Sequence, residues 1–190
     1  PGLVDTAAQI QNSTLVPDAF YARWRVVAED GSGVLDETDA TFALRNTSHA
    51  FYVNDAYNPA EDIYCSAAGN SAFDGLTPAT PKDSLQTILD TYDLEGGDIV
   101  FVDSGTYASA SDIRFIWSRS GDTNADVVIQ GNTNGAYTLF TRTGLTNYPA
   151  VGMNVKASHL ELTHLGIHGM DRGILLESNR NVSVRGVVIS

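Results

Sequence analysis

The sequence predicts an all-β protein built from short strands that recur along the chain, together with one helix. The 190 residues include 17 Asp but 6 Glu, and 9 Arg but 2 Lys. Asp, Asn, Gly, Ser and Thr favour turns and strands over helices, so this composition argues against a helical bundle. Short apolar stretches near the end of the chain recur 21 or 22 residues apart, and one segment carries clear helix start and stop signals.

Charge and composition exclude two classes of partner. The net charge is −12, whereas a surface that binds nucleic acid needs a basic stripe. No run of about 18 apolar residues is present, so we expect no membrane span. With 43% hydrophobic residues the chain can bury a core. The single cysteine, Cys65, allows no internal disulfide, and we expect it to be a small buried residue.

The first part of the chain predicts a pair of strands. Residues 20–30 alternate between outward and inward side chains, residues 30–33 form a turn, and residues 40–44 form a second strand. This pattern, over residues 15–46, resembles the last two strands of a fibronectin type III-like module. The resemblance implies that residues 1–48 end such a module, which usually serves as a spacer or adhesive unit. The earlier strands of the module would lie upstream, or this segment packs on something else.

One helix is predicted before residue 97. Thr80 is the expected N-cap, Pro81 suits the first helical position, and Asp83 stands where a reciprocal capping acid belongs. The expected end is Gly96-Gly97. The apolar stripe that this helix would bury consists of Leu85, Ile88, Leu89 and Tyr92.

The motifs around this helix form a recognisable order. They are Tyr52-Val53, then Asp74-Gly75-x-x-Pro78-x-x-Pro81, then Ser84-Leu85-Gln86, then Gly97-Asp98-x-Val100-x-Val102-x-x-Gly105-x-Tyr107. This order resembles the N-terminal entry of right-handed parallel β-helices, the pectin/pectate-lyase-like superfamily. In that superfamily the helix caps the end of the solenoid, which would otherwise expose an apolar cross-section and an unpaired strand edge. The resemblance implies an entry strand, loop and capping helix over residues 49–97, and the first rungs over residues 98–190.

The end of the chain predicts stacked repeats without reference to any family. The aligned pairs are Leu160 with Val182, Leu162 with Val184 and Ile167 with Ile189 at an offset of 22, and residues 152–155 with 173–176 at an offset of 21. Residues 126–130 and 137–140 supply an earlier, less regular repeat, which gives three or four rungs in all. Leucine-rich repeats share this period, but their ladder of Leu and Asn is absent.

The chain stops directly after an apolar run at residues 187–189. A single repeat cannot bury both of its faces, so we expect further rungs beyond this point, or a partner that covers this end. We therefore expect the sequence to be a fragment of a longer protein. Open strand edges pair readily, so self-association through these ends is a further expectation.

Two groups of side chains are candidate site residues. Lys156, Arg180 and Arg185 occupy outward positions on the predicted rungs and are candidates to face a carbohydrate. The loop after residue 54 is rich in oxygen donors, which Ca²⁺ prefers as ligands. Its candidate calcium ligands are Asp55, Asp62 and Asp74. The alternative for both groups is structural, with a solvated solenoid face for the basic residues and local turns for the loop.

His159, His164 and His168 suggest a zinc site at first sight. Their spacings of 5 and 4 would suit a helix, but this stretch predicts strand and turn. The odd spacing in a strand puts the first two on opposite faces. We interpret all three as polar turn residues that stack at the ends of rungs.

The predicted function is that of a non-catalytic extracellular or cell-surface β-helix with an adhesive, carbohydrate-facing or fibre-forming role. The alternative is the N-terminal part of a polysaccharide lyase or epimerase that acts on uronate-containing polysaccharide. Such an enzyme needs a base and a cation that neutralises the uronate carboxylate, and no cluster of several Asp around a basic residue is evident. Fold alone does not decide between the two, so whether the protein is an enzyme stays open.

Overall fold

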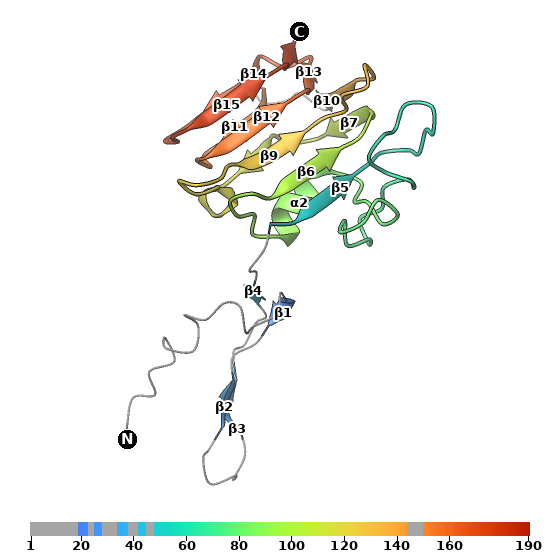
Figure 1. The fold of residues 1–190 in the computed structure, drawn as a ribbon. Coiled ribbons are helices and arrows are strands. Elements are labelled where there is room, and N and C mark those ends of the chain that lie inside the picture. The colour runs from blue at the N-terminus through green and yellow to red at the C-terminus, as the bar shows by residue number, and fades with distance from the viewer. Residues whose placement is uncertain (1–18, 23–24, 28–33, 38–41, 45–47, 144–149) are drawn as a thin grey trace. The chain divides into compact units, whose positions relative to one another are not determined.

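The computed structural model of the protein describes residues 19–22, 25–27, 34–37, 42–44, 48–143 and 150–190. The chain divides into two compact units, Pro1–Thr47 and Ser48–Ser190. The described residues are predominantly β-strand, with parallel sheets in the second unit and one short α-helix (Figure 1).

The first unit contains two antiparallel strand pairs. They are β1 (Ala19–Ala22) with β4 (Phe42–Leu44), and β2 (Arg25–Val27) with β3 (Val34–Glu37). The sequence predicted one strand over residues 20–30, whereas the structure has β1 and β2 there, and β3 was not predicted. The predicted turn at residues 30–33 lies outside the described residues.

The second unit holds all the parallel sheets. Its strands are β5 (Ala50–Val53), β6 (Ile99–Val102), β7 (Gly105–Ser109), β8 (Ile113–Phe115), β9 (Val127–Gln130), β10 (Thr138–Arg142), β11 (Val151–Val155), β12 (Leu160–Thr163), β13 (Gly166–His168), β14 (Arg172–Leu176), β15 (Val182–Arg185) and β16 (Val188–Ile189). A short 3₁₀ helix, η2 (Trp117–Arg119), follows β8.

These strands pair in a repeating order. The sheets run β15-β12-β9-β6-β5, β16-β13-β10-β7 and β14-β11-β8. Each strand from β6 to β13 therefore pairs with the strand three places later, so that three consecutive strands form one rung and successive rungs stack. Such an order is compatible with a β-helix-like solenoid.

The strand register confirms the predicted repeat. Leu160 pairs with Val182, and Ile167 pairs with Ile189, both at the offset of 22. Met153 pairs with Ile174, at the offset of 21. The repeat could be read from the sequence because each inward position keeps an apolar side chain from one rung to the next.

The core of the second unit is a column of inward side chains in this register. Phe51, Val100, Ile129, Leu162 and Val184 lie opposite one another on the five strands of the largest sheet. The first four are fully buried, whereas Val184 is 43% exposed. A rung with neighbours on both sides therefore buries its inward side chains against theirs.

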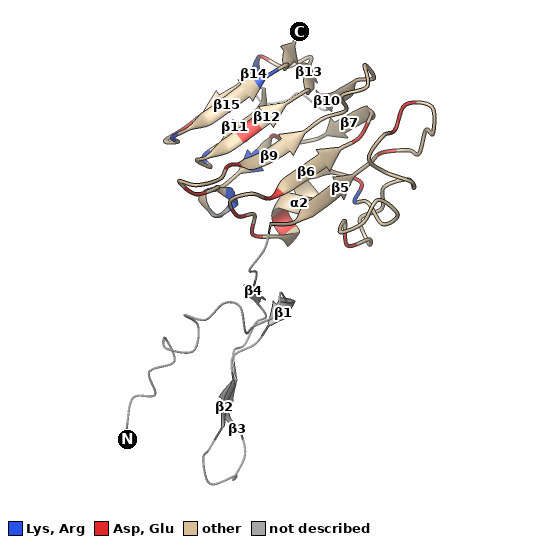
Figure 2. Ribbon diagram, viewed as in Figure 1, with Lys and Arg blue, Asp and Glu red and all other residues tan. Residues whose placement is uncertain are grey.

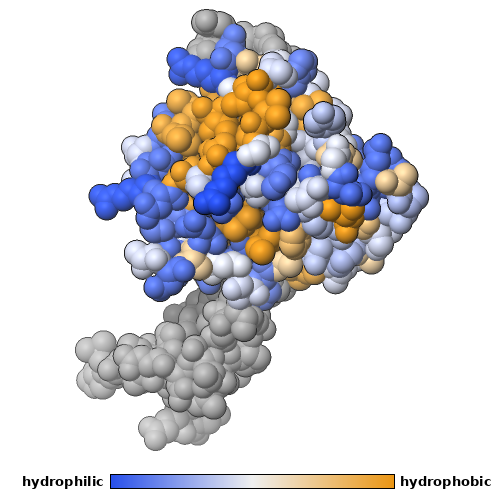
Figure 3. All heavy atoms as spheres, turned by 45° about the horizontal axis from the view of Figure 1, so that its top comes forward, coloured by the Kyte–Doolittle hydropathy of each residue, from blue (hydrophilic) through white to orange (hydrophobic). Residues whose placement is uncertain are grey.

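The last strand of each sheet carries exposed apolar side chains. Leu176, Val184, Val188 and Ile189 are 43–59% exposed. They belong to β14, β15 and β16, and apolar surface is prominent on the side of the molecule that faces the viewer in Figure 3. We call these four residues the apolar end.

Helix α2 (Leu85–Thr91) begins later than predicted. Its N-cap is Ser84, whose Oγ accepts a hydrogen bond from the Thr87 N–H at 3.2 Å, so the prediction of Thr80 as the cap is wrong. The preceding backbone is held extended, because Lys82 N–H donates to Tyr52 O and Lys82 O accepts from Asn54 N–H, each at 2.9 Å. A residue bridged to β5 in this way cannot belong to a helix.

The helix also ends before Gly96-Gly97. Tyr92 has an extended backbone, its ring lies 4.8 Å from that of Phe51, and its Oη donates to Asp74 O at 2.7 Å. These contacts turn the chain out of the helix at Tyr92. The predicted stripe is confirmed, since all four of its members are buried, namely Leu85, Ile88, Leu89 and Tyr92.

A pair of leucine substitutions tests the buried column. Leu162→Ala should lower the free energy of unfolding by about 2–5 kcal/mol, because the fully buried side chain leaves a cavity. Leu176→Ala removes the same atoms from a side chain that is 49% exposed and should cost about 1 kcal/mol or less. Urea denaturation followed by circular dichroism measures both, and equal losses would contradict the proposed core.

Candidate functional site

A buried carboxylate anchors the long loop between β5 and α2. Asp103, the first residue after β6, is fully buried. Its donors are the backbone N–H groups of Ile63, Tyr64, Cys65 and Ser104, at 2.8–3.0 Å, and Nδ2 of Asn132 at 2.9 Å. Burying a carboxylate is costly unless it is hydrogen-bonded, and five donors satisfy both oxygens here. The loop is thereby fixed against the carboxyl end of β6.

The three candidate calcium ligands each have protein donors of their own. Their hydrogen bonds are those of Asp55 Oδ2 with Thr106 N–H at 2.9 Å, Asp62 Oδ1 with Ser104 Oγ at 2.6 Å, and Asp74 Oδ1 with Thr80 Oγ1 at 2.7 Å. Within the described ranges no group of three or more His, Cys, Asp or Glu is placed to hold a metal ion. Calcium binding stays a prediction.

Thr80 acts on Asp74 rather than as a helix cap. The Thr80 hydroxyl and the Leu76 N–H both donate to the carboxylate. These hydrogen bonds, that of Thr80 more strongly, lower the pKa of Asp74 below its usual value. A carboxyl with a lowered pKa in the folded state stabilises that state at neutral pH. This contribution is lost as the pH falls through the lowered pKa.

Cys65 is buried as predicted, with 7% exposure. Burial raises the pKa of its thiol, and the neighbouring Asp103 and Asp62 carboxylates raise it further. The thiol therefore stays protonated at neutral pH, which makes it a poor nucleophile or metal ligand.

The outer face of the five-stranded sheet carries two rows of side chains in register, and one of them contains aromatic rings. Tyr52, Phe101, Gln130, Thr163 and Arg185 lie opposite one another on β5, β6, β9, β12 and β15. We call this set the outer row. Neighbouring strands are about 4.8 Å apart, so four intervals span about 19 Å along the stacking direction. The strands of this sheet are mostly free of charged residues (Figure 2).

Aromatic rings and one amide form the beginning of the outer row. Tyr64, from the loop held by Asp103, lies with its ring 4.6 Å from that of Phe101, which in turn is 5.7 Å from Tyr52. Gln130 Nε2 donates to the Tyr64 hydroxyl at 2.8 Å. Phe101 and Gln130 were not among the predicted site residues. Both residues alternate with buried neighbours in β6 and β9, and this alternation is the sequence signal from which their outward position could have been predicted.

The three basic candidates do not lie together in one cluster. Arg185 ends the outer row and forms an ion pair with Glu161, with Nε 3.6 Å from Oε1. Lys156 follows β11 and pairs with Glu177 at 3.5 Å. Arg180 lies in the turn before β15, where its backbone N–H donates to a serine. The structure thus separates Arg185 on the sheet from Lys156 and Arg180 on the turns.

Two of the histidines occupy strained turn positions at opposite ends of β12. His159 has φ 52° and His164 has φ 55°, in the left-handed region. One rung later, the same turns hold Asn181 with φ 52° and Gly186 with φ 59°. Asn and Gly tolerate this region best, so the shared conformation shows that the turns stack with the strands. His168 ends β13, and its Nδ1 lies 3.0 Å from Ser190 Oγ.

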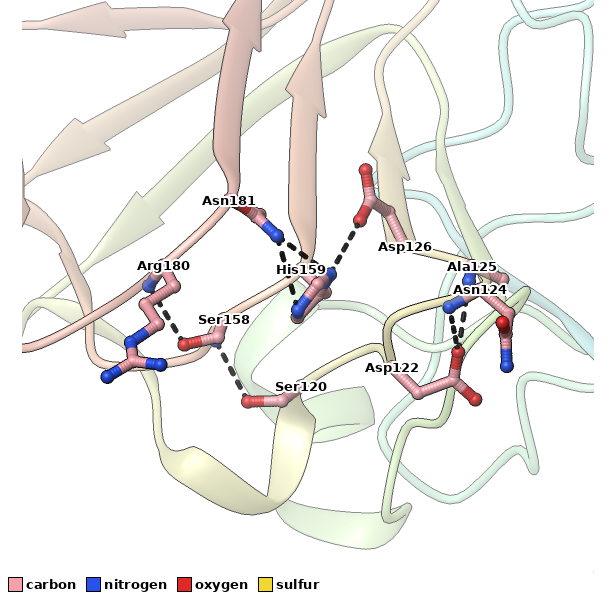
Figure 4. A network of polar contacts seen from close by, with 9 residues as sticks. All are labelled: Ser120, Asp122, Asn124, Ala125, Asp126, Ser158, His159, Arg180 and Asn181. Atoms are coloured by element: carbon pink, nitrogen blue, oxygen red, sulfur yellow. Dashed lines mark hydrogen bonds and ion pairs between the residues drawn. The ribbon is translucent and has the colours of Figure 1, made fainter.

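Polar contacts join these stacked turns (Figure 4). Ser158 N–H donates to Ser120 Oγ at 2.9 Å, and Arg180 N–H donates to Ser158 Oγ at 3.0 Å. His159 Nδ1 lies 3.6 Å from Asp126 Oδ1 and 3.4 Å from Asn181 Nδ2. The histidine therefore links the turns before β9, β12 and β15. Its partners suit a structural contact between turns rather than metal binding.

No family model matches the chain, and neither a similar curated protein nor a similar solved structure is found. Over the described part of the chain, no helix combines the length and the apolar character needed to cross a membrane.

Substitution of Asp103 tests the anchor of the loop. Asp103→Asn replaces an accepting oxygen with an amide that itself donates, which leaves buried N–H groups without partners at about 1–3 kcal/mol each. We expect the free energy of unfolding to fall by about 3 kcal/mol or more. The control is Asp90→Asn, since Asp90 is exposed and accepts only a surface bond from Gln86 among the described residues. Its change should stay within about 0.5 kcal/mol, and equal denaturation midpoints would contradict this role of Asp103.

Proposed function

We propose that the second unit is the capped N-terminal end of a right-handed parallel β-helix of the pectin/pectate-lyase-like type, and that its outer sheet face binds polysaccharide outside the cell or at its surface. The pairing of each strand from β6 to β13 with the third one after it supports the fold. The antiparallel pairs of the first unit support a preceding fibronectin type III-like segment. Such a protein has a binding or adhesive role, with no catalytic step of its own.

The outer row is the observation that carries this proposal. A polysaccharide is a linear chain of repeating sugars, and the row extends over about 19 Å with four of its five side chains at least partly exposed. Aromatic rings supply apolar area for the C–H face of a sugar. Gln130 and the Arg185–Glu161 pair supply hydrogen-bond partners for hydroxyl groups, whereas Thr163 is buried and its hydroxyl lies 2.7 Å from His164 Nδ1.

Binding is favoured over cleavage of uronate polymers. A lyase needs a base beside a cation that neutralises the uronate, but Arg185 and Lys156 are each paired with a carboxylate, and Arg180 lies on a turn away from Arg185 on the sheet. The net charge of −12 also repels a polyanion. The rival activity is measured directly, because cleavage of polygalacturonate by a lyase produces an unsaturated sugar that absorbs ultraviolet light. A rise in absorbance would contradict the proposal of binding without catalysis and would indicate a lyase.

Binding to a panel of soluble polysaccharides tests the proposal. The panel contains neutral glucans and galactans, with polygalacturonate beside them. Arg185→Ala should raise the Kd for the bound neutral polysaccharide by about tenfold, equivalent to about 1.4 kcal/mol. Arg172→Ala is the matched control, since Arg172 is also exposed but lies on β14 in another sheet, and its Kd should not change. Equal effects of both variants, or no binding to any polysaccharide, would contradict the proposal.

Self-association is a second candidate, favoured by the apolar end. Exposed apolar side chains and the last strand of each sheet lie together there. The opposite end is covered by α2, which packs against β5 and β8, so we propose that two copies meet by their apolar ends about a twofold axis. Light scattering should give a mass that rises with protein concentration toward that of a dimer, and Val188→Asp should keep the chain monomeric. A monomer at every concentration would contradict this.

A further inference from the structure

A cavity of about 550 Å³ lies between the start of α2 and strand β7, on a different part of the molecule from the outer row. Small-molecule sites have volumes of about 300–1,000 Å³, so this cavity has room for a mono- or disaccharide. The residues that line it include Asp55, Asp83, Tyr107, Ala108 and Phe140. We propose that this cavity is a second ligand site, and that it takes an amino sugar, a small ligand with hydroxyl groups and one ammonium group.

The free edge of β7 supplies backbone partners to the cavity. β7 is the edge strand of its sheet, at the opposite end from β16. The Gly105 N–H donates to Tyr137 O, and Ser109 O accepts from the Thr143 N–H, each at 2.9 Å, so odd-numbered residues of β7 face β10. The backbone groups of Thr106 and Ala108 therefore point to the free edge. Asp55 Oδ2 accepts from the Thr106 N–H, which leaves the N–H and C=O of Ala108 for a ligand.

The charge of the cavity selects the ligand class. Its lining contains two carboxylates, those of Asp55 and Asp83, and no Lys, Arg or His. Asp83 is exposed, and none of the described residues gives its carboxylate a hydrogen bond or an ion pair. These groups accept hydrogen bonds from hydroxyls, attract an ammonium group and repel a uronate or a phosphate.

The position of Asp55 is built into the fold. Gly105 has φ 138°, and a Cβ at this position would collide with the Asp55 carboxylate. The absence of a side chain at Gly105 is therefore what allows Asp55 to reach the edge of β7. Asp55 also accepts from the Ala56 N–H at 2.5 Å, so the carboxylate is held before any ligand arrives.

Apolar side chains form the floor of the cavity. Tyr107 and Phe140 are 6% and 2% exposed, and their ring centroids are 5.3 Å apart. The Tyr107 hydroxyl is already used, since it donates to Asp103 O at 3.1 Å. The cavity thus pairs a fixed apolar floor with acidic and backbone groups, which matches a sugar that has one C–H face and a rim of polar groups.

The preference for cations over anions follows from the cavity alone, whereas the choice of a sugar over another small amine rests on the proposed function. The two are tested by separate readouts. Amide NMR spectra of the full 190-residue chain are recorded with galactosamine, galactose and galacturonate. Galactosamine should shift the amide signals of residues 106–110, galactose should do so at about tenfold higher concentration, and galacturonate should not shift them.

Asp83→Asn should weaken galactosamine binding by at least tenfold and galactose binding less. Glu177→Gln is the control, because it removes one negative charge from an exposed side chain outside the cavity lining, and it should change neither. Equal binding of galacturonate, equal effects of the two variants, or no shift in residues 106–110 would overturn the proposal. Polysaccharide binding by the Asp83→Asn protein should stay unchanged. Absence of polysaccharide binding by the unchanged chain, with galactosamine binding intact, would contradict the outer row and not the cavity.

Discussion

The register of the buried column is the constraint on which the rest of the second unit depends. Each strand has only two to five residues, too few to be stable as an isolated pair in water. A strand gains stability only when its inward side chains lie over those of the neighbouring rungs, as Ile129 and Leu162 do. A slip by one residue would turn every inward side chain outward. The turns must therefore have a fixed length and conformation.

The turns meet this requirement through a few specific contacts. His159 and Asn181 adopt the same left-handed conformation in consecutive rungs, and serine hydroxyls accept hydrogen bonds from the next turn. After β6, Asp103 fixes the long loop by the three hydrogen bonds that it accepts from Ile63, Tyr64 and Cys65. The same register that buries one set of side chains places the alternate set in the outer row. The proposed binding face is thus a consequence of the packing.

Much of the strand order could be predicted from the sequence, because the apolar repeat reports directly on packing between rungs. The stripe of α2 was predicted for the same reason, but its start was not. Thr80 and Pro81 carry local helix signals, whereas the backbone of Lys82 is held by β5, about 30 residues earlier in the chain. Such a long-range contact overrides the local helix signals, and no local sequence pattern predicts it.

The candidate sites could be predicted less well. Asp55, Asp62 and Asp74 share a loop and a composition, but each has different hydrogen-bond donors in the structure. The contact of Tyr64 with Phe101 depends on how Asp103 folds the loop, so it could not be derived from spacing. Arg185 could be placed on the outward face, since strand alternation determines it, although its partner Glu161 lies on another strand.

Amide hydrogen exchange measured by NMR tests the stacked register most directly. Strands β9 and β12 have a paired strand on both sides, whereas β15 and β16 are each last in their sheets. The stacking predicts the slowest exchange in β9 and β12, and exchange that is faster by orders of magnitude in β15 and β16. Protection in β15 and β16 equal to that in β9 and β12, in the monomeric chain, would contradict it.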